Sequence, residues 1–188
     1  MVLGMKRLTT EWQVGDGREE ALAQRVLAKA RPGDVDDAIR VVDEFAYDES
    51  FLINVGDEKG ALLDAAIERA QPRLLLELGT YCGYSALRTV RKMPADAHLI
   101  SIEYVEANAA IARRILDHAG VGDRVTIIVG SLADDGTTAA TLSASTASRS
   151  ARSTSSSSIT TRTSTCLISS GSSGADGCTR VQWSSPTM

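Results

Sequence analysis

Three short apolar runs, separated by segments of helical character, constrain the fold of this chain more than any other feature. The runs are 73–78, 98–102 and 125–129, and the segments between them, 85–93 and 107–119, are expected to be helices. Strand, helix, strand, helix and strand in this order, with short turns, predict right-handed βαβ units and a parallel sheet. Because the runs are apolar throughout instead of alternating, both faces of the sheet are expected to be covered.

Three amphipathic helices are expected before the first strand. They cover about 19–30, 35–48 and 58–70, each with apolar residues on one face. Residues 1–18 show no such period and are interpreted as a loose N-terminal arm.

The composition of the chain changes sharply near residue 142. Residues 142–188 hold 16 Ser and 8 Thr in 47 positions and carry a charge of +3, whereas residues 1–141 carry −7. So few apolar side chains cannot offset roughly 1–2 kcal/mol of backbone entropy per ordered residue. We therefore expect a partial domain at 19–141 and a Ser/Thr-rich tail at 142–188 that is disordered or out of frame.

Charge and cysteine content exclude several classes of protein. A formal charge of −4 gives no electrostatic reason to expect nucleic acid or an anionic membrane as a partner. Three Cys in 188 residues do not make a disulfide framework, so a reducing, cytoplasmic location is expected. No apolar run is long enough for a transmembrane helix, and the N-terminus lacks the apolar core of a signal peptide. Nothing in the sequence indicates an oligomeric state.

The turn after the first strand carries the clearest ligand-binding pattern. In the string Glu-Leu-Gly-Thr-Tyr-Cys-Gly-Tyr-Ser at 77–85, Gly79 and Gly83 let the backbone approach a ligand without a Cβ in the way. The helix that begins near Ser85 presents free N–H groups and a positive dipole end. Glu103 ends the second strand, where an acid accepts hydrogen bonds from both hydroxyls of a ribose. The pattern predicts an adenosine-type ligand at the carboxyl edge of the sheet.

The spacing of the glycines distinguishes between adenosine-type ligands. Gly-x-x-x-Gly is not the dinucleotide fingerprint, and no Gly-Lys-Ser/Thr string exists for a phosphate loop, which disfavours a nucleotide-dependent dehydrogenase. Glu77 would repel a pyrophosphate but suits a cation, so S-adenosylmethionine, with its sulfonium and ammonium groups, is the natural candidate. Taken alone, the turn is also compatible with an ordinary βα connection that carries a solvated acid.

A wider set of strings resembles the catechol O-methyltransferase family. The resemblance runs from about Glu19 to Asp134, and Tyr-Cys-Gly-Tyr-Ser at 81–85 is its specific string. The other matching strings are Asn-Val-Gly-Asp-Glu-Lys-Gly at 54–60, Ile-Glu at 102–103, Asp-His-Ala-Gly-Val at 117–121 and Ile-Val-Gly at 128–130. The resemblance implies an α/β fold: a Rossmann-like class I methyltransferase sheet with N-terminal helices, incomplete on its C-terminal side.

The resemblance also implies a set of site residues. The residues that would line the S-adenosylmethionine site are Val55, Gly79, Tyr81, Ser85 and Glu103. Glu77 would face the amino-acid end of the cofactor, and Gly130 would lie near its adenine. Phe51 and Ile53 stand where the family has the apolar walls of the pocket for a small catechol-type acceptor.

The family also needs a metal site and a base, and this chain does not contain them. In the family, Mg²⁺ orients two catechol hydroxyls and a Lys takes a proton, with metal ligands from an Asp-His-x-Lys segment and an Asp-Asn pair. Mg²⁺ prefers carboxylate oxygens, but beyond Asp135 the chain has only Asp176 and no Lys. Ile159, Thr187 and Met188 would stand at the three ligand positions, and Arg162, which cannot accept a proton at neutral pH, at that of the base.

No catalytic or metal-binding residue is therefore assigned, and the chain as written is predicted not to catalyse metal-dependent methyl transfer. The alternative from another class is a non-catalytic S-adenosylmethionine- or adenosine-binding module with a disordered interaction tail.

One hypothesis about the tail would restore the missing motifs. If residues from about 142 onward are translated one nucleotide out of frame, the codons of 159–162 can restore Asp-His-Asp-Lys, and those of 186–188 can restore Ala-Asp-Asn. The two restored aspartates fall at positions 159 and 187, 28 residues apart and in the order of the family's motifs. A genuine Ser/Thr-rich linker or modification segment is the alternative.

The frameshift hypothesis makes a testable prediction about the coding DNA. Sequencing from the codon of Leu142 onward is expected to reveal Asp-His-Asp-Lys and Asp-Asn codons in one shifted register. An unbroken frame with no methyltransferase motif in that register would contradict the hypothesis and leave the linker interpretation.

Overall fold

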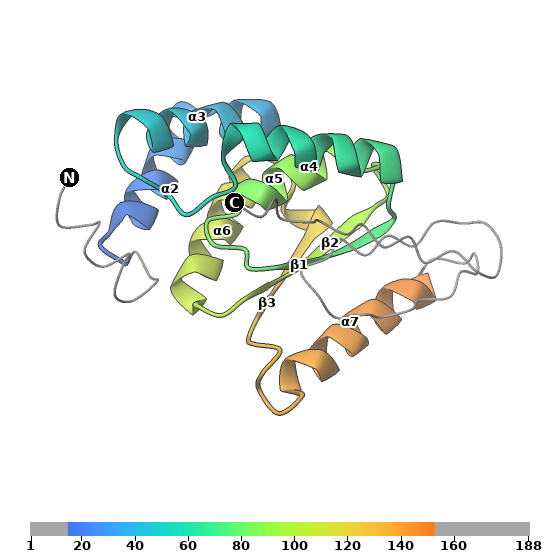
Figure 1. Cartoon of the computed structure of the whole chain (residues 1–188). Helices are drawn as coiled ribbons and strands as arrows, with labels where there is room; N and C mark the ends of the chain where they lie inside the picture. Colours follow the sequence, from blue (N-terminus) through green and yellow to red (C-terminus); the bar gives the residue numbers. More distant parts are fainter. Residues whose placement is uncertain (1–14, 153–188) are drawn as a thin grey trace, which may run out of the picture.

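Three parallel strands form the centre of the structure, a computed structural model that describes residues 15–152 (Figure 1). The strands are β1 (Leu74–Leu78), β2 (His98–Glu103) and β3 (Val125–Val129), in the order β1-β2-β3. Leu74 lies opposite His98 in the first pair, and Leu99 lies opposite Val125 in the second. The predicted α/β fold with a parallel sheet is confirmed, and each strand lies within one residue of its predicted bounds.

Helices precede, connect and cover the strands. They are α2 (Arg18–Lys29), α3 (Val35–Asp48), α4 (Gly56–Ala70), α5 (Tyr84–Lys92), α6 (Glu106–His118) and α7 (Thr137–Arg152), with a short 3-10 helix η1 (Gly122–Arg124) before β3. Helices α2 to α6 lie on one side of the sheet and α7 lies on the other (Figure 1). Among the helices described, none combines the length and the apolarity needed to span a membrane.

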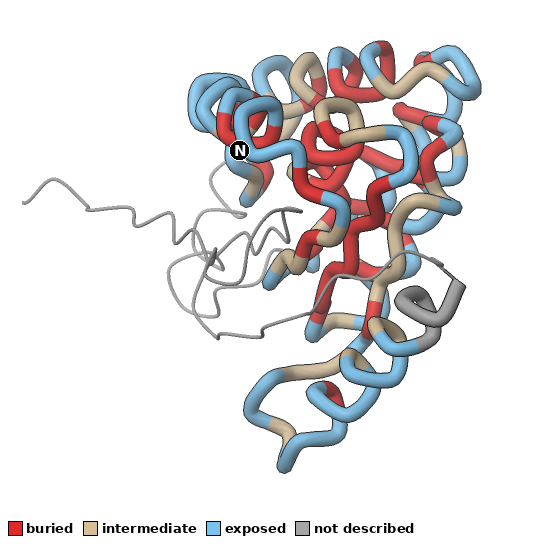
Figure 2. Tube along the Cα trace, turned by 90° about the vertical axis from the view of Figure 1, so that its right-hand side faces the viewer, coloured by how far each residue is buried: buried red, intermediate tan, exposed pale blue. Residues whose placement is uncertain are grey.

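The main core lies between the sheet and helices α2 to α6. Side chains from every layer are fully buried in it, among them Leu22, Val42, Ile67, Leu75, Leu87, Leu99 and Ile115. Figure 2 shows these layers as a band of buried residues, while α7 is mostly exposed over residues 137–147. Each such side chain contributes about 1.5–3 kcal/mol when it is buried, so this face of the sheet supplies most of the stability of the described residues.

The other face of the sheet has a much smaller core. Ile100, Ile102 and Ile128 are buried there, and Leu142 of α7 is one of the partly buried residues that pack against them. Of the described helices, only α7 covers this face.

Helix α7 corrects the expectation of little regular structure after about Leu142. The helix passes through that position and ends at Arg152, so the predicted boundary between 141 and 142 lies inside an element. Asp134 caps its first turn, because a carboxylate oxygen of Asp134 accepts the N–H of Thr138 at 3.0 Å. Thr141 and Ser143 donate their hydroxyls to carbonyls four residues earlier. The Ser/Thr side chains thus find partners within the helix, and its Ala residues favour it.

The N-terminal arm predicted at 1–18 also needs correction at its end. Arg18 belongs to α2, and its side chain is only 9% exposed in an ion pair with Asp16. The remainder of that prediction, for 1–14, and the tail prediction for 153–188 lie outside the described residues.

A buried ion pair joins the helices that cover the sheet. Arg88 of α5 and Asp64 of α4 are 7% and 8% exposed, with Nη2 and Oδ2 2.6 Å apart. Arg88 also donates to the hydroxyl of Tyr84 at 2.9 Å, and that hydroxyl donates to Asp43 of α3 at 2.6 Å. Three helices are therefore held together by one polar network.

Removing one partner of this pair should destabilise the protein. Asp64→Asn leaves the Arg88 guanidinium buried without its counter-charge, which is expected to lower the free energy of unfolding by about 3 kcal/mol. The matched control is Glu68→Gln on the same helix, which breaks an exposed pair with Lys92 and should cost less than about 1 kcal/mol. Urea denaturation of both variants measures the difference; equal effects would mean that the buried network contributes no more than a surface pair.

Candidate functional site

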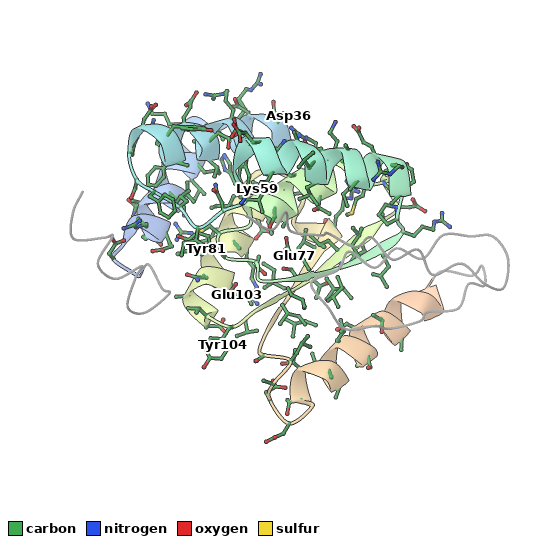
Figure 3. The ribbon with its side chains drawn as sticks, viewed as in Figure 1. Asp36, Lys59, Glu77, Tyr81, Glu103 and Tyr104 are labelled. Carbon is green, nitrogen blue, oxygen red and sulfur yellow. The ribbon has the colours of Figure 1, made fainter. Side chains whose placement is uncertain are left out.

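The carboxyl ends of β1, β2 and β3 meet at one edge of the sheet. The N–H of Gly79, just after β1, donates to the carbonyl of Ile102 in β2 at 2.8 Å. The N–H of Gly130, just after β3, donates to the carbonyl of Glu103 at 2.9 Å. In a parallel sheet this edge is where ligands bind, and Figure 3 shows Glu77, Tyr81 and Glu103 near one another there.

Glu103 connects the end of β2 to the turn after β1. The residue is 6% exposed, and its Oε2 accepts the N–H groups of Thr80 at 3.0 Å and Tyr81 at 2.8 Å. Its Oε1 accepts the N–H of Val105 at 2.9 Å. Successive N–H groups beside a left-handed residue form an anion-binding concavity, and Tyr81 has φ +48°.

The predicted role of Glu103 therefore needs refinement. A carboxylate has roughly four acceptor positions, and the backbone occupies three of them. Glu103 keeps one position for an external donor, whereas the sequence interpretation has it accept hydrogen bonds from both hydroxyls of a ribose.

Glu77 is an acid without a cationic partner among the described residues. Its carboxylate accepts hydrogen bonds from Ser85 Oγ at 2.6 Å and Ser101 Oγ at 2.5 Å. Burial raises the pKa of the Glu77 carboxyl above its ordinary value; the two hydroxyl hydrogen bonds oppose this and nearby Glu103 adds to it. Such a group favours either a proton or an incoming cation.

The two glycines of the turn have different roles. Gly79 has φ +91°, and a Cβ placed on it would meet no heavy atom within 4 Å, so the space above it is open. Gly83 has φ +83°, and its Cβ would lie 3.4 Å from the Cβ of Ala112 in α6. The open space at Gly79 suits the ligand-approach role predicted for it, whereas Gly83 lies in van der Waals range of α6 and is favoured there by its left-handed backbone.

The side chain of Tyr81 reaches helix α2. Its hydroxyl donates to Glu19 Oε1 at 2.9 Å, and burial raises the pKa of that hydroxyl, which keeps it protonated. Glu19 was not among the predicted site residues, because it stands 62 residues before Tyr81 in the sequence and no local motif connects them.

Several apolar side chains stay exposed around this edge. Val55, Ile53 and Phe51 are 37%, 41% and 60% exposed in the segment before α4, and Tyr104, next to Glu103, is 74% exposed. Exposed apolar side chains gathered in one region are typical of a binding surface. Tyr104 was missed because a single aromatic residue after a strand carries no pattern.

Gly130 does not face open space. A Cβ placed on it would collide with Oγ1 of Thr138, which is 2% exposed in the first turn of α7. The glycine is therefore required by packing, and its predicted position near an adenine stays a prediction.

The described residues hold no candidate metal centre. Within 15–152 there is no group of three or more His, Cys, Asp or Glu side chains arranged to hold a metal ion. The ligand positions implied by the resemblance, at 159, 187 and 188, lie outside this range.

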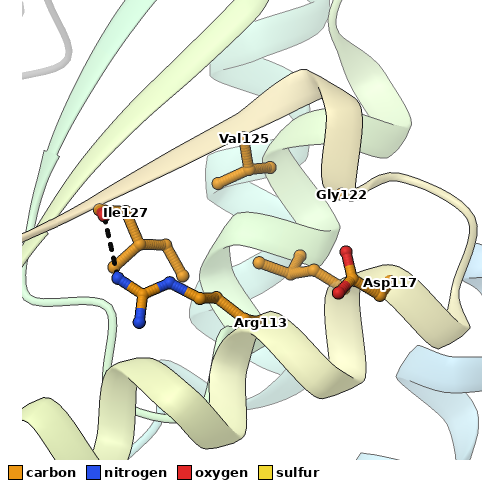
Figure 4. Close-up of a pocket in the computed structure, with 6 residues that line it drawn as sticks. Arg113, Asp117, Gly122, Val125 and Ile127 are labelled. Atoms are coloured by element: carbon orange, nitrogen blue, oxygen red, sulfur yellow. Dashed lines mark hydrogen bonds between the residues drawn. The ribbon is translucent and has the colours of Figure 1, made fainter.

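A small cavity lies elsewhere, between α6 and β3 (Figure 4). Its volume is about 210 Å³, and it is lined by Arg113, Leu116, Asp117, Gly122, Val125 and Ile127. Arg113 donates to the carbonyl of Ile127 at 3.1 Å. None of the predicted site residues lines this cavity, so it is separate from the candidate site.

A parallel sheet with a glycine turn after its first strand and an acid at the end of its second defines a Rossmann-like domain, the class of fold that binds ligands at the carboxyl ends of its strands. Comparison with known proteins identifies the family: residues 37–137 match a family model described as O-methyltransferase. The chain belongs to this O-methyltransferase family, and the resemblance to catechol O-methyltransferases is confirmed.

The relatives agree with this assignment. The chain is 54% identical over 143 residues to a probable O-methyltransferase of Mycobacterium tuberculosis, Rv1703c, across 76% of this chain and 61% of that protein. It is 39% identical over 121 residues to catechol O-methyltransferase of Mus musculus, across 64% of this chain and 46% of that protein. The chain thus spans about half the length of the curated relatives it matches.

A solved structure with local similarity is the O-methyltransferase TomG from Streptomyces achromogenes, determined in complex with SAM. It is 27% identical, with a TM-score of 0.44 over 70% of this chain and 50% of that chain.

The environment of Glu77 predicts a pH-dependent effect on stability. A carboxyl whose pKa is raised by folding stabilises the protein at low pH, and this contribution is lost as the pH rises through the folded-state pKa. Glu77→Gln, which imitates the neutral form, is therefore expected to have a higher melting temperature than the wild type at about pH 8. The gain should vanish toward about pH 4, near the pKa of an unfolded Glu.

Thermal denaturation at the two pH values measures this effect. Asp123→Asn removes one exposed carboxylate at the opposite end of the sheet and controls for the change in net charge. A difference in melting temperature between Glu77→Gln and the wild type that is equal at both pH values would contradict the interpretation.

Proposed function

We propose that the carboxyl edge of the sheet binds S-adenosylmethionine and that the protein derives from an O-methyltransferase acting on small catechol-type acceptors. The observation that carries the proposal is Glu77: a partly buried acid hydrogen-bonded by Ser85 and Ser101, without a cationic partner among the described residues, beside the open face of Gly79. A cationic nucleoside ligand suits this environment, whereas a pyrophosphate would be repelled.

The adenosine end of the ligand would lie along β2. The remaining acceptor position of Glu103 suits one ribose hydroxyl, and the neighbouring Gly79 lets the ligand approach the backbone. Gly130, just after β3, would lie near the adenine. The turn and the ribose would share the carboxylate of Glu103. A ligand that binds here would therefore also affect the conformation of the turn.

The amino-acid end would lie along the turn between β1 and α5. There the ammonium group would neutralise Glu77, and Ser85 and Val55 would line the same end of the site. TomG, the structural relative, is described as bound to SAM, which supports this cofactor.

The acceptor would lie beside the exposed side chains of Phe51 and Ile53. The name of the mouse relative, a catechol O-methyltransferase, supports a catechol-type acceptor. In that chemistry a bound Mg²⁺ would orient the acceptor's oxygens, but the residues of 15–152 do not provide a fitting set of ligands.

We therefore propose that the chain as written binds the cofactor without metal-dependent turnover. This coincides with the second candidate function, a non-catalytic binding module. It is favoured because the residues of 15–152 place no set of metal ligands beside Glu77 and Glu103.

Calorimetry with S-adenosylmethionine tests the cofactor proposal. The wild type is expected to bind, and Glu77→Gln, by losing an ion pair to the ammonium group, should weaken binding by about 10- to 100-fold. Asp123→Asn should bind like the wild type. The absence of wild-type binding, or equal binding by Glu77→Gln, would contradict the proposal. Glu77→Gln is thus expected to gain stability at neutral pH and to lose affinity.

A methylation assay tests the proposed loss of catalysis. With pure protein, S-adenosylmethionine and a catechol, no methylated product is expected with or without Mg²⁺. Turnover by the 188-residue chain would overturn this part of the proposal.

A further inference from the structure

Two consecutive residues at the start of α2 contact two separate segments around the candidate site. Glu19 contacts the turn after β1, and Arg18 contacts the segment before α4. We propose that Arg18 and Glu19 are a positioning pair that fixes segment 51–55 relative to turn 79–83 and thereby shapes the S-adenosylmethionine site. The role in ligand binding rests on the function proposed above.

Glu19 holds the side chain of Tyr81. Glu19 is 4% exposed, and its Oε1 accepts the Tyr81 hydroxyl at 2.9 Å and the N–H of Gly15 at 3.3 Å. Tyr81 has a left-handed backbone, with φ +48°, which a side-chain-bearing residue keeps only when its surroundings hold it there. Glu103 holds the Tyr81 N–H at 2.8 Å, so the residue is fixed at both its backbone and its ring.

Arg18 holds the backbone of Phe51. Its Nη1 donates to the Phe51 carbonyl at 2.5 Å, while Nε and Nη2 donate to the two carboxylate oxygens of Asp16 at 2.8 and 2.6 Å. The hydrogen bonds from Arg18 lower the pKa of Asp16 to about 2, so this pair stays charged. A planar guanidinium held on one side presents its remaining donors in a fixed direction.

These contacts connect segments that are far apart in the sequence. Arg18 lies 33 residues before Phe51, and Glu19 lies 62 residues before Tyr81. Segment 51–55 has no helix or strand of its own, and Phe51 exposes 60% of its surface. Because Arg18 and Glu19 share one helical turn, the two walls of the site are set against one rigid element, with Tyr81 and Glu103 on the same side of the sheet edge (Figure 3).

Hydrogen exchange of the ligand-free protein tests the pair without reference to any ligand. Glu19→Leu removes the acceptor and should raise exchange in 79–83, whereas Glu19→Gln keeps an acceptor oxygen and should stay near the wild type. Arg18→Met should raise exchange in 51–55. Glu20→Gln is the matched control, since Glu20 is on the same turn but pairs with Arg114 at the surface. Tyr81→Phe removes the same hydrogen bond from the other side and replaces Glu19→Leu if that variant does not fold.

Calorimetry with S-adenosylmethionine then measures the effect on the site. Glu19→Leu and Arg18→Met should each weaken binding by about 10-fold, the size expected when one ordering contact is lost. Glu19→Gln should restore affinity, which a role confined to global stability would not produce.

The outcomes separate the two proposals. Wild-type exchange and affinity in both Glu19→Leu and Arg18→Met, or exchange that rises uniformly over the core, would overturn the positioning pair. If hydrogen exchange rises locally in these variants as expected, but the wild type does not bind S-adenosylmethionine, the positioning pair is supported and the proposed function is contradicted.

Discussion

The turn between β1 and α5 depends on the carboxylate of Glu103. The turn contains left-handed residues at Gly79, Tyr81 and Gly83, so its N–H groups cannot be satisfied by a regular helix or strand. Glu103 accepts two of them from the end of the neighbouring strand. Glu103 thereby holds the backbone of Thr80 and Tyr81 against the end of β2. The parallel register of β1 and β2 makes it possible, because it places the end of one strand beside the turn that follows the other.

A second acid at the same edge explains why the arrangement suits a cation. Burial disfavours ionisation of Glu77, and the nearby carboxylate of Glu103 acts in the same direction. Hydroxyl groups from Ser85 and Ser101 satisfy the carboxylate of Glu77, but they bring no positive charge. The edge is therefore electrostatically incomplete, and a ligand with an ammonium or sulfonium group would complete it.

Much of this structure was predictable from the sequence, and the exceptions have a physical reason. The strands and the helices before α7 follow from apolar periodicity, and Glu77, Gly79 and Glu103 follow from a local turn motif. Glu19 could not be predicted, because its contact with Tyr81 depends on packing across 62 residues. Helix α7 was missed because composition counts Ser and Thr against a helix, whereas capping by Asp134 and back-bonding hydroxyls depend on position.

The larger core and the residues of the proposed cofactor site lie on the same side of this sheet, and catalysis requires more. The core under α2 to α6 buries side chains from every layer and holds Glu19, Tyr81 and Glu77 in place. The opposite face has a small cluster with Leu142 packed against it. In the family that this chain resembles, the metal ligands and the base come from later segments. A cofactor edge supported by the larger core can therefore persist where those ligands are missing, and binding without turnover is physically consistent.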